Sequence, residues 1–240
     1  MREKTVAIIQ ARMGSTRLPG KVLRELSGQP VLYHIIKRIE QVSGIDKIMV
    51  ATTEEEIDNS IESYVNSIGF SCFRGSSDNV LDRFYHAATS ACADVIIRVT
   101  ADNPLVDPRV LEQLLAYFGR CGYDYVATSG YPIGLGAEIF TYGALNTAYK
   151  NASLPYEKEH VTPYMYREGQ TVGRLVAPVD QSSLRFTMDT PEDYVFIQQV
   201  YDALYHGSHD FYLDDVLALL RKYPDMVEIN AHVHQKKLGE

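Results

Sequence analysis

Apolar residues along this 240-residue chain follow two alternating patterns. Short, almost continuous apolar runs predict strands that are buried on both faces, as in a parallel sheet. Between them, apolar residues recur at the three- and four-residue spacing of an amphipathic helix, for example from Val31 to Val42. The predicted strands are 6–9, 47–51, 70–73, 94–100 and 124–128, and the predicted helices are 31–42, 54–68, 80–92 and 107–120.

This alternation of strands and helices predicts an α/β fold. A β-α-β-α-β order with right-handed crossovers gives a doubly wound sheet with helices on both faces. In such a sheet, ligands bind at the carboxyl ends of the strands, so the loops that follow strands are the first candidates for chemistry. Further along, a strand that ends at Asp189, a helix capped by Thr190 and a helix over 213–223 complete the pattern.

The composition restricts the class of protein. Hydrophobic residues make up 45% of the chain and charged residues 22%, which is typical of a globular protein with a sizeable core. The net charge of −8 argues against nucleic acid or an anionic membrane as a partner, and no apolar run is long enough to span a membrane. The three cysteines have neither disulfide nor zinc-site spacing, and reduced thiols suit the cytoplasm. We therefore expect a cytoplasmic protein without a nucleic-acid or membrane partner.

The loop after the first predicted strand is the strongest candidate for a binding site. Its glycines, Gly14 and Gly20, let backbone N–H groups approach a ligand, and its cations are Arg12, Arg17 and Lys21. This combination suits a polyphosphate, although a solvated basic turn is the simpler alternative. The loop is neither a Walker A sequence nor a G-x-G-x-x-G dinucleotide fingerprint, because its glycine spacing differs from both.

The same loop resembles the first loop of the sugar-activating cytidylyltransferases. It reads Q-A-R-M-G-S-T-R-L-P-G-K over residues 10–21, and within those enzymes it is most similar to the spore coat polysaccharide biosynthesis cytidylyltransferase family. The resemblance implies a Rossmann-like, three-layer α/β/α nucleotidyltransferase fold of the GT-A-like kind, with a mostly parallel central sheet. It also implies one domain over 1–240, with a nucleotide-binding half at 1–128 and an acceptor-binding half with C-terminal helices at 129–240.

The resemblance implies a function as well. Such enzymes transfer CMP from CTP to a sugar or sugar acid, release pyrophosphate and use Mg²⁺, in the synthesis of surface polysaccharide or other glycan precursors. The implied partners are CTP and a sugar or sugar-acid acceptor, and homodimers are common among similar enzymes. The family assigns Arg12, Arg17 and Lys21 to catalysis and Ala11, Gly14 and Ser15 to nucleotide binding.

Two carboxylates at predicted strand ends are candidate Mg²⁺ ligands. Asp102 follows the strand 94–100, where phosphates gather in a doubly wound sheet, although an aspartate shortly before Pro104 can simply start a turn. Asp189 precedes a helix cap, so capping does not explain it. The resemblance makes both aspartates catalytic metal ligands. It makes Arg185, in the motif R-x-x-x-D-T-P-E-D, a candidate for binding phosphate or the acceptor.

Residues after the second and third predicted strands are implied to contact the nucleotide base. The segment R-G-S-S-D-N-V-L-D-R-F over 74–84 resembles a family segment of the form R-G-x-x-x-D-V-L-x-R that lies beside the nucleotide base. The resemblance places Arg74, Gly75 and Asp78 near the cytosine and ribose. Thr52 and Thr53 end the second strand and are implied to face the base. Asp78 has an alternative role as the cap of the helix that follows.

Two later segments are implied to bind the acceptor. The Gly-rich stretch 129–138 reads as a long loop over an edge of the site, and the family's G-x-x-x-E element assigns Gly134 and Glu138 to the acceptor. A hairpin turn with an exposed Glu138 is the alternative. An E-H-V-T-P-Y stretch at the start of a helix assigns Glu159 and His160 to the acceptor, although a lone histidine there is often structural.

Two other functions share parts of this pattern. A glycosyltransferase has a similar nucleotide-binding sheet but typically holds its metal with D-x-D at a strand end, where this chain has T-A-D-N-P over 100–104. A non-catalytic nucleotide sensor is expected to have lost Asp102 or Asp189. Asn103 also differs from the acidic pair of the deoxy-octulosonate enzymes, so the sequence leaves the identity of the sugar open.

Overall fold

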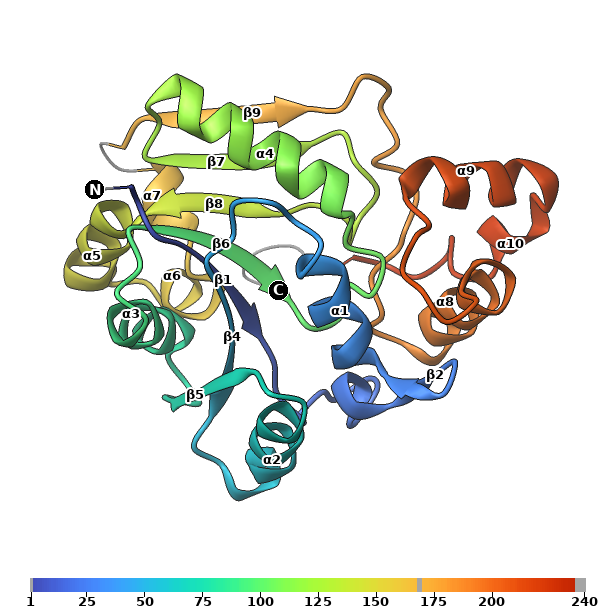
Figure 1. Cartoon of the computed structure of the whole chain (residues 1–240), viewed down its shortest axis with the longest axis horizontal. Helices are drawn as coiled ribbons and strands as arrows, with labels where there is room; N and C mark the ends of the chain where they lie inside the picture. Colours follow the sequence, from blue (N-terminus) through green and yellow to red (C-terminus); the bar gives the residue numbers. More distant parts are fainter. Residues whose placement is uncertain (1, 168–169, 236–240) are drawn as a thin grey trace.

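A seven-stranded sheet runs through the centre of the protein, with helices on both of its faces (Figure 1). We describe it from a computed structural model, in which residues 2–167 and 170–235 are placed. The strand order is β5-β4-β1-β6-β8-β7-β9. The strands are β1 (Thr5–Gln10), β4 (Lys47–Thr53), β5 (Ser71–Gly75), β6 (Val95–Thr100), β7 (Tyr125–Ser129), β8 (Glu138–Thr141) and β9 (Val172–Val176), and the short β2 (Glu25–Leu26) and β3 (Gln29–Pro30) form a separate hairpin.

Most strand pairs are parallel. β1 lies between β4 and β6 and is parallel to both, β5 continues beside β4, and β7 pairs with β9 in the same sense. In the part of the chain that the structure describes, β8 is the only strand of this sheet that runs antiparallel to its neighbours, β6 and β7. The predicted α/β/α architecture with a mostly parallel sheet is confirmed.

Helices cover both faces of the sheet, and a further group of helices lies beside one end of it (Figure 1). One face carries α1 (Val31–Ile39), α2 (Asn59–Ser67) and α4 (Pro108–Cys121), and the other carries α3 (Val80–Ser90), α5 (Tyr142–Asn151), α6 (Pro155–His160) and α7 (Pro163–Arg167). The C-terminal α8 (Pro191–Leu204), α9 (Leu213–Lys222) and α10 (Asp225–Glu228) gather beside one end of the sheet (Figure 1). Across residues 2–167 and 170–235 we find no helix with the length and apolar character needed to span a lipid bilayer.

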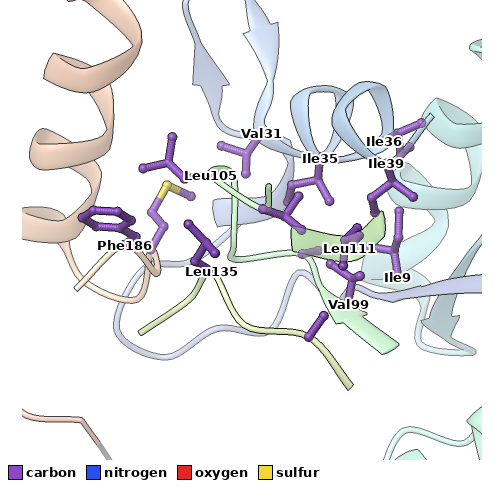
Figure 2. Close-up of a cluster of buried hydrophobic side chains, with 14 of the residues drawn as sticks. Ile9, Val31, Ile35, Ile36, Ile39, Val99, Leu105, Leu111, Leu135 and Phe186 are labelled. Carbon is purple, nitrogen blue, oxygen red and sulfur yellow. The ribbon is translucent and has the colours of Figure 1, made fainter. Parts of the chain in front are cut away.

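The central strand explains why the apolar runs are continuous. Alternate side chains of β1 enter two different cores: Ala7 and Ile9 pack with α1, α2 and α4, and Val6 and Ile8 pack with α3 and α5. All four side chains are fully buried. Figure 2 shows the first core, where side chains of α1 meet Ile9 and residues of β6 and α4. A strand covered on both faces has no solvent-facing position that would favour a polar residue.

Three local predictions were wrong. Asp78 does not cap α3, because the side chain of Asn79 accepts the hydrogen bond from the Asp82 N–H at 3.0 Å and Asp78 is exposed. The residues before Asp189 form no strand of the sheet. They lie against the loop before β8, to which they are joined by an isolated bridge at Arg185. The predicted helix 54–68 is divided into a 3-10 turn, η2 (Glu56–Asp58), and α2.

A histidine pair, in which His34 is buried and His209 half-buried, joins α1 to the segment between α8 and α9. His34 Nε2 lies 2.6 Å from the carbonyl oxygen of Leu26, so this nitrogen donates. His34 Nδ1 then accepts from His209 Nε2 at 2.8 Å. Burial lowers the pKa of His34 to about 4, and burial together with the nearby His34 lowers the pKa of His209 to about 3. Both rings are therefore neutral partners at neutral pH.

The stability of the fold should decrease as the pH falls below the ordinary histidine pKa. In the unfolded chain both histidines gain a proton near pH ~6.5, whereas in the fold they stay neutral to much lower pH. Stability is therefore full above pH ~6.5 and is lost as the pH falls toward the folded pKa values, by up to ~1.4 kcal/mol per pH unit for each histidine. Urea unfolding of the wild type and His34→Phe between neutral and mildly acidic pH measures this slope.

The variant His34→Phe should show a shallower slope than the wild type. His206→Gln, a change at an exposed histidine of the same segment, should keep the wild-type slope. Equal slopes for the wild type and His34→Phe would contradict the prediction.

Candidate active site

A cavity of about 870 Å³ opens at the carboxyl ends of β1 and β6. Its wall combines the loop after β1, the loop after β6, the loop before β8, the end of α6 and the segment before α8. The residues predicted from the sequence that line it are Arg12, Gly14, Ser15, Arg17, Lys21, Asp102, Gly134, Glu159, His160 and Asp189. The fold thus brings the predicted cationic loop, both predicted carboxylates and part of the predicted acceptor site into one space.

Backbone hydrogen bonds fold the loop after β1 back on itself. The carbonyl oxygen of Met13 accepts from Ser15 N at 2.8 Å and from Gly20 N at 3.1 Å. Gly20 has a φ of 68°, a left-handed conformation that suits glycine, and it begins the 3-10 turn η1 (Lys21–Leu23). Ala11 is buried, and its N–H donates to Ala51 on β4 at 3.2 Å. Ala11 therefore anchors the loop to the sheet and does not line the cavity.

A buried carboxylate, which the sequence analysis did not identify, holds the other side of this loop. Asp58 in η2 is 1% exposed and accepts the Met13 N–H at 2.7 Å. Its second oxygen accepts from Thr53 Oγ1 at 2.5 Å. The loop is thus fixed to the end of β4 through Asp58. No local pattern marks this aspartate as a support of the loop, because Met13 lies 45 residues away in the sequence.

Lys21 joins the two predicted metal ligands. Its Nζ lies 2.8 Å from Asp102 Oδ2 and 2.8 Å from Asp189 Oδ1. Two arginines also reach Asp189 Oδ2, each at 3.1 Å: Arg17 from the same loop and Arg185 from the segment before α8. The second oxygen of Asp102 accepts from Thr100 Oγ1 at 2.6 Å. Three cations and two carboxylates therefore meet in one cluster, of which all members except Arg185 line the cavity.

The mutual charges decide the protonation states of this cluster. Burial works to lower the pKa of Lys21, but the charges of Asp102 and Asp189 outweigh it and raise the pKa above the ordinary lysine value. Burial works to raise the pKa of Asp189, but Lys21, followed by Arg17 and Arg185, holds it below the ordinary aspartate value. The lysine is an ammonium and the aspartate a carboxylate at neutral pH.

Asp193 supports Asp189 from the first turn of α8. The predicted Thr190 cap is confirmed, with a capping box that Asp193 completes. Asp193 is fully buried, and its carboxylate accepts hydrogen bonds from Nε and Nη2 of Arg185 at 2.8 and 2.9 Å. Asn230, another residue that the sequence analysis did not identify, donates to Asp193 Oδ1 at 2.9 Å and to the Arg185 carbonyl at 3.0 Å. Arg185 is thereby an internal support of Asp189 that does not line the main cavity.

Comparison with known proteins decides the family. Residues 6–217 match the family model described as Cytidylyltransferase. The chain belongs to the cytidylyltransferase family. It is 38% identical to an uncharacterized protein, MJ1063, of Methanocaldococcus jannaschii over 99% of this chain and 98% of that protein. It is 35% identical to the spore coat polysaccharide biosynthesis protein SpsF of Bacillus subtilis, over 91% and 94% of the two chains.

A solved structure supports the same assignment. A cytidylyltransferase from Leptospira borgpetersenii serovar Hardjo-bovis superposes with a TM-score of 0.88 at 30% identity, and the match covers 98% of this chain and 100% of that one. The resemblance expected from the first loop and the fold implied by it are therefore confirmed.

The residues predicted beside the nucleotide base do not line the main cavity of this cytidylyltransferase. Thr52 and Thr53 are buried in the sheet. Arg74 turns toward α2, where it donates to the carbonyls of Thr53 and Glu55 at 3.0 Å and pairs with Glu62 at 3.0 Å. The other two members of the set, Gly75 and Asp78, also lie outside the cavity wall. Nucleotide binding by these five residues stays a prediction.

Arg83 of α3 lines the cavity, although it was not among the residues predicted beside the nucleotide base. It is 1% exposed, and its Nη1 donates to the Ser76 carbonyl at 2.6 Å. Among the described residues no carboxylate forms an ion pair with it, and burial together with the charge of Arg12 lowers the pKa of its guanidinium to about 10. Arg83 closes the segment 74–83. The arginine that ends the family form R-G-x-x-x-D-V-L-x-R falls on this position, but no role was assigned to it from the sequence. The cytidylyltransferase thus holds two arginines, Arg12 and Arg83, whose charge is available for an anion.

Glu138 is an internal anchor. The stretch before it does connect the antiparallel neighbours β7 and β8, as a hairpin would, but the expectation of an exposed Glu138 is wrong. Its carboxylate accepts from Arg98 Nη1 at 2.5 Å, from the Tyr125 hydroxyl at 2.5 Å and from Thr162 Oγ1 at 2.8 Å. Burial, with Glu138 adding to it, raises the pKa of Tyr125. Glu138 neutralises Arg98, which lines the cavity, and does not itself line it. Its contact with the acceptor stays a prediction.

His160 enters the cavity from the end of α6, and not from the start of a helix as predicted. Burial, with Arg98 adding to it, lowers the pKa of His160, so its ring is neutral at neutral pH. The next residue, Val161, has a φ of 70°, and Thr162 N donates to the His160 carbonyl at 2.8 Å across it. This γ-turn is strained for a β-branched residue, by roughly 1–3 kcal/mol. It directs His160 to the cavity while Thr162 reaches Glu138.

Gly134 should be intolerant of any side chain. A Cβ atom there would lie 2.4 Å from Thr187 N, and the φ of 90° disfavours other residues. Gly134→Ala should therefore lower the free energy of unfolding by roughly 2–4 kcal/mol. For a chain of this size the midpoint of thermal unfolding should fall by roughly 4–16 °C. Calorimetry or circular dichroism measures the change.

Gly14 provides the matched control for this prediction. It lines the same cavity, but a Cβ atom there would meet nothing within 4 Å, and its φ is not positive. Gly14→Ala should therefore unfold within about 2 °C of the wild type. Equal stability of the two variants would show that the approach of Gly134 to Thr187 is not a constraint.

Proposed function

We propose that this cytidylyltransferase transfers CMP from CTP to a sugar or sugar-acid acceptor and releases pyrophosphate, in the synthesis of a surface polysaccharide or another glycan precursor. The cluster of Lys21 and Arg17 with Asp102 and Asp189 supports this proposal most directly. It unites a glycine-containing cationic loop with Asp102, which follows the parallel strand β6, and with Asp189, which reaches the same place from the segment before α8. Nucleotide phosphates bind at the carboxyl ends of the strands in such sheets.

The cationic side of the cavity suits the triphosphate. Backbone N–H groups of the loop after β1 and the charges of Arg12, Arg17 and Lys21 can hold the phosphates that depart as pyrophosphate. In the reaction an acceptor oxygen forms a bond to the α-phosphorus while the bond from that phosphorus to the bridging oxygen breaks. The proton of the acceptor hydroxyl leaves to solvent or to a phosphate oxygen. The enzyme contributes alignment and charge neutralisation, and no covalent intermediate is needed.

Asp102 and Asp189 are the residues that would hold Mg²⁺. Their side chains are 25% and 15% exposed, and Mg²⁺ commonly binds one or two carboxylates together with substrate phosphates. No third histidine, cysteine or carboxylate joins them within the described ranges, so phosphate oxygens fit as the remaining ligands. When bound, the metal would neutralise charge on the phosphates.

The opposite wall of the cavity suits the acceptor. It contains Tyr156, Glu159 and a neutral His160, and Arg98 there is neutralised by Glu138. These groups donate and accept hydrogen bonds, as hydroxyl groups of a sugar require. We place the reaction in the cytoplasm, in agreement with three free cysteines. The family match and the sequence over 100–104, which has no D-x-D, do not favour the glycosyltransferase alternative.

Arg17→Ala should reduce turnover by about two orders of magnitude or more, because it removes a cation from the triphosphate site. The measurement is pyrophosphate release from CTP over a panel of sugars and sugar acids. Arg24→Ala is the matched control, since Arg24 follows the same loop but packs on Tyr194 outside the cavity. It should retain nearly full activity. Full activity of Arg17→Ala would remove the loop from the proposed mechanism.

A further inference from the structure

Lys21 lies where a metal ion held by Asp102 and Asp189 would have to lie. Its Nζ is 2.8 Å from one carboxylate oxygen of each aspartate. Mg²⁺ bound by the same two oxygens would sit about 2.0–2.1 Å from each, in the space between them. An ammonium group and a metal ion cannot share that space. The two aspartates therefore hold either the lysine or the metal.

The charges of the cluster strengthen this competition. The cations Lys21, Arg17 and Arg185 are matched by three carboxylates, those of Asp102, Asp189 and Asp193. A free divalent cation would enter a cluster whose charges already balance. The same cavity also contains Arg12 and Arg83, which form no ion pair with a carboxylate among the described residues, so its charge disfavours a free cation further. A triphosphate, with about four negative charges, reverses this balance and attracts Lys21 and Arg17.

We propose that Lys21 is an exchangeable cation, which holds the two aspartates until a nucleoside triphosphate binds and then turns to the phosphates. The site then accepts the divalent cation as a complex with the triphosphate and not as a free ion. Lysine suits this task, because its ammonium is a compact charge on a flexible four-carbon stem. With two carboxylates and no third metal-binding side chain in the described part of the chain, the site is completed by phosphate oxygens. This inference rests on the proposed function.

Metal binding without nucleotide tests the exchange. Mn²⁺ serves as the probe, and its binding to the protein alone is measured by electron paramagnetic resonance. Lys21→Met keeps the length of the side chain and removes its charge, so it should bind Mn²⁺ at least about tenfold more tightly than the wild type. Lys37→Met, at an exposed lysine paired with Glu40, should bind Mn²⁺ as the wild type does. Adding Asp102→Asn to Lys21→Met should abolish the gain.

Two outcomes would overturn the inference. One is equal Mn²⁺ affinity of the wild type and Lys21→Met, and the other is a gain that survives Asp102→Asn. Thermal unfolding of the wild type with CTP and Mg²⁺ separates this inference from the proposed function. If CTP stabilises the wild type but Lys21→Met gains no affinity for Mn²⁺, the exchange is refuted and the function stands. If CTP does not stabilise the wild type, the proposed function fails.

Discussion

The bridge from Lys21 to Asp102 and Asp189 is the interaction on which the active site depends. It joins three segments, since the lysine is 81 residues from the first aspartate and 168 from the second. A partly buried charge is stable only when opposite charges and hydrogen bonds surround it, so each of the three groups depends on the other two. The loop after β1, the end of β6 and the segment before α8 are consequently held in one arrangement. In the proposed function, that arrangement also determines where the phosphates and the metal would bind.

The C-terminal helices belong to the active site although none of them enters its cavity. Asp193 is both the third residue of a helix capping box and the partner of Arg185, which in turn contacts Asp189. Asn230, just after α10, closes the same network from the far side. A capping motif, which by itself explains only where α8 begins, thus also orients the carboxylate of Asp189. Small changes in these helices can therefore alter the site through Arg185.

The sequence predicted the parts of the molecule that are determined locally. Buried parallel strands are continuous apolar runs, and Asp102 stands at a strand end, so the sheet and this carboxylate could be predicted. The antiparallel β8 and the edge strand β9 are short, with no periodic pattern, and were not predicted. Thr53 was expected at the base but donates to Asp58, because the direction of a side chain at a strand end depends on its tertiary partners. Arg83 ends the family motif over 74–83, but no role was assigned to it, since a motif does not show which of its arginines faces a cavity.

Thermal unfolding with nucleotides tests the central claim most directly. The wild type is heated with CTP, UTP, GTP or ATP, each with Mg²⁺, and in parallel with a nucleotide sugar. At about a hundredfold excess over Kd, binding adds ~2.7 kcal/mol, which corresponds to a rise of roughly 5–11 °C for a chain of this size. A cytidylyltransferase that uses this cavity should respond to CTP most strongly and lose the response on Arg17→Ala. No response to any triphosphate, together with a response to the nucleotide sugar, would contradict the account.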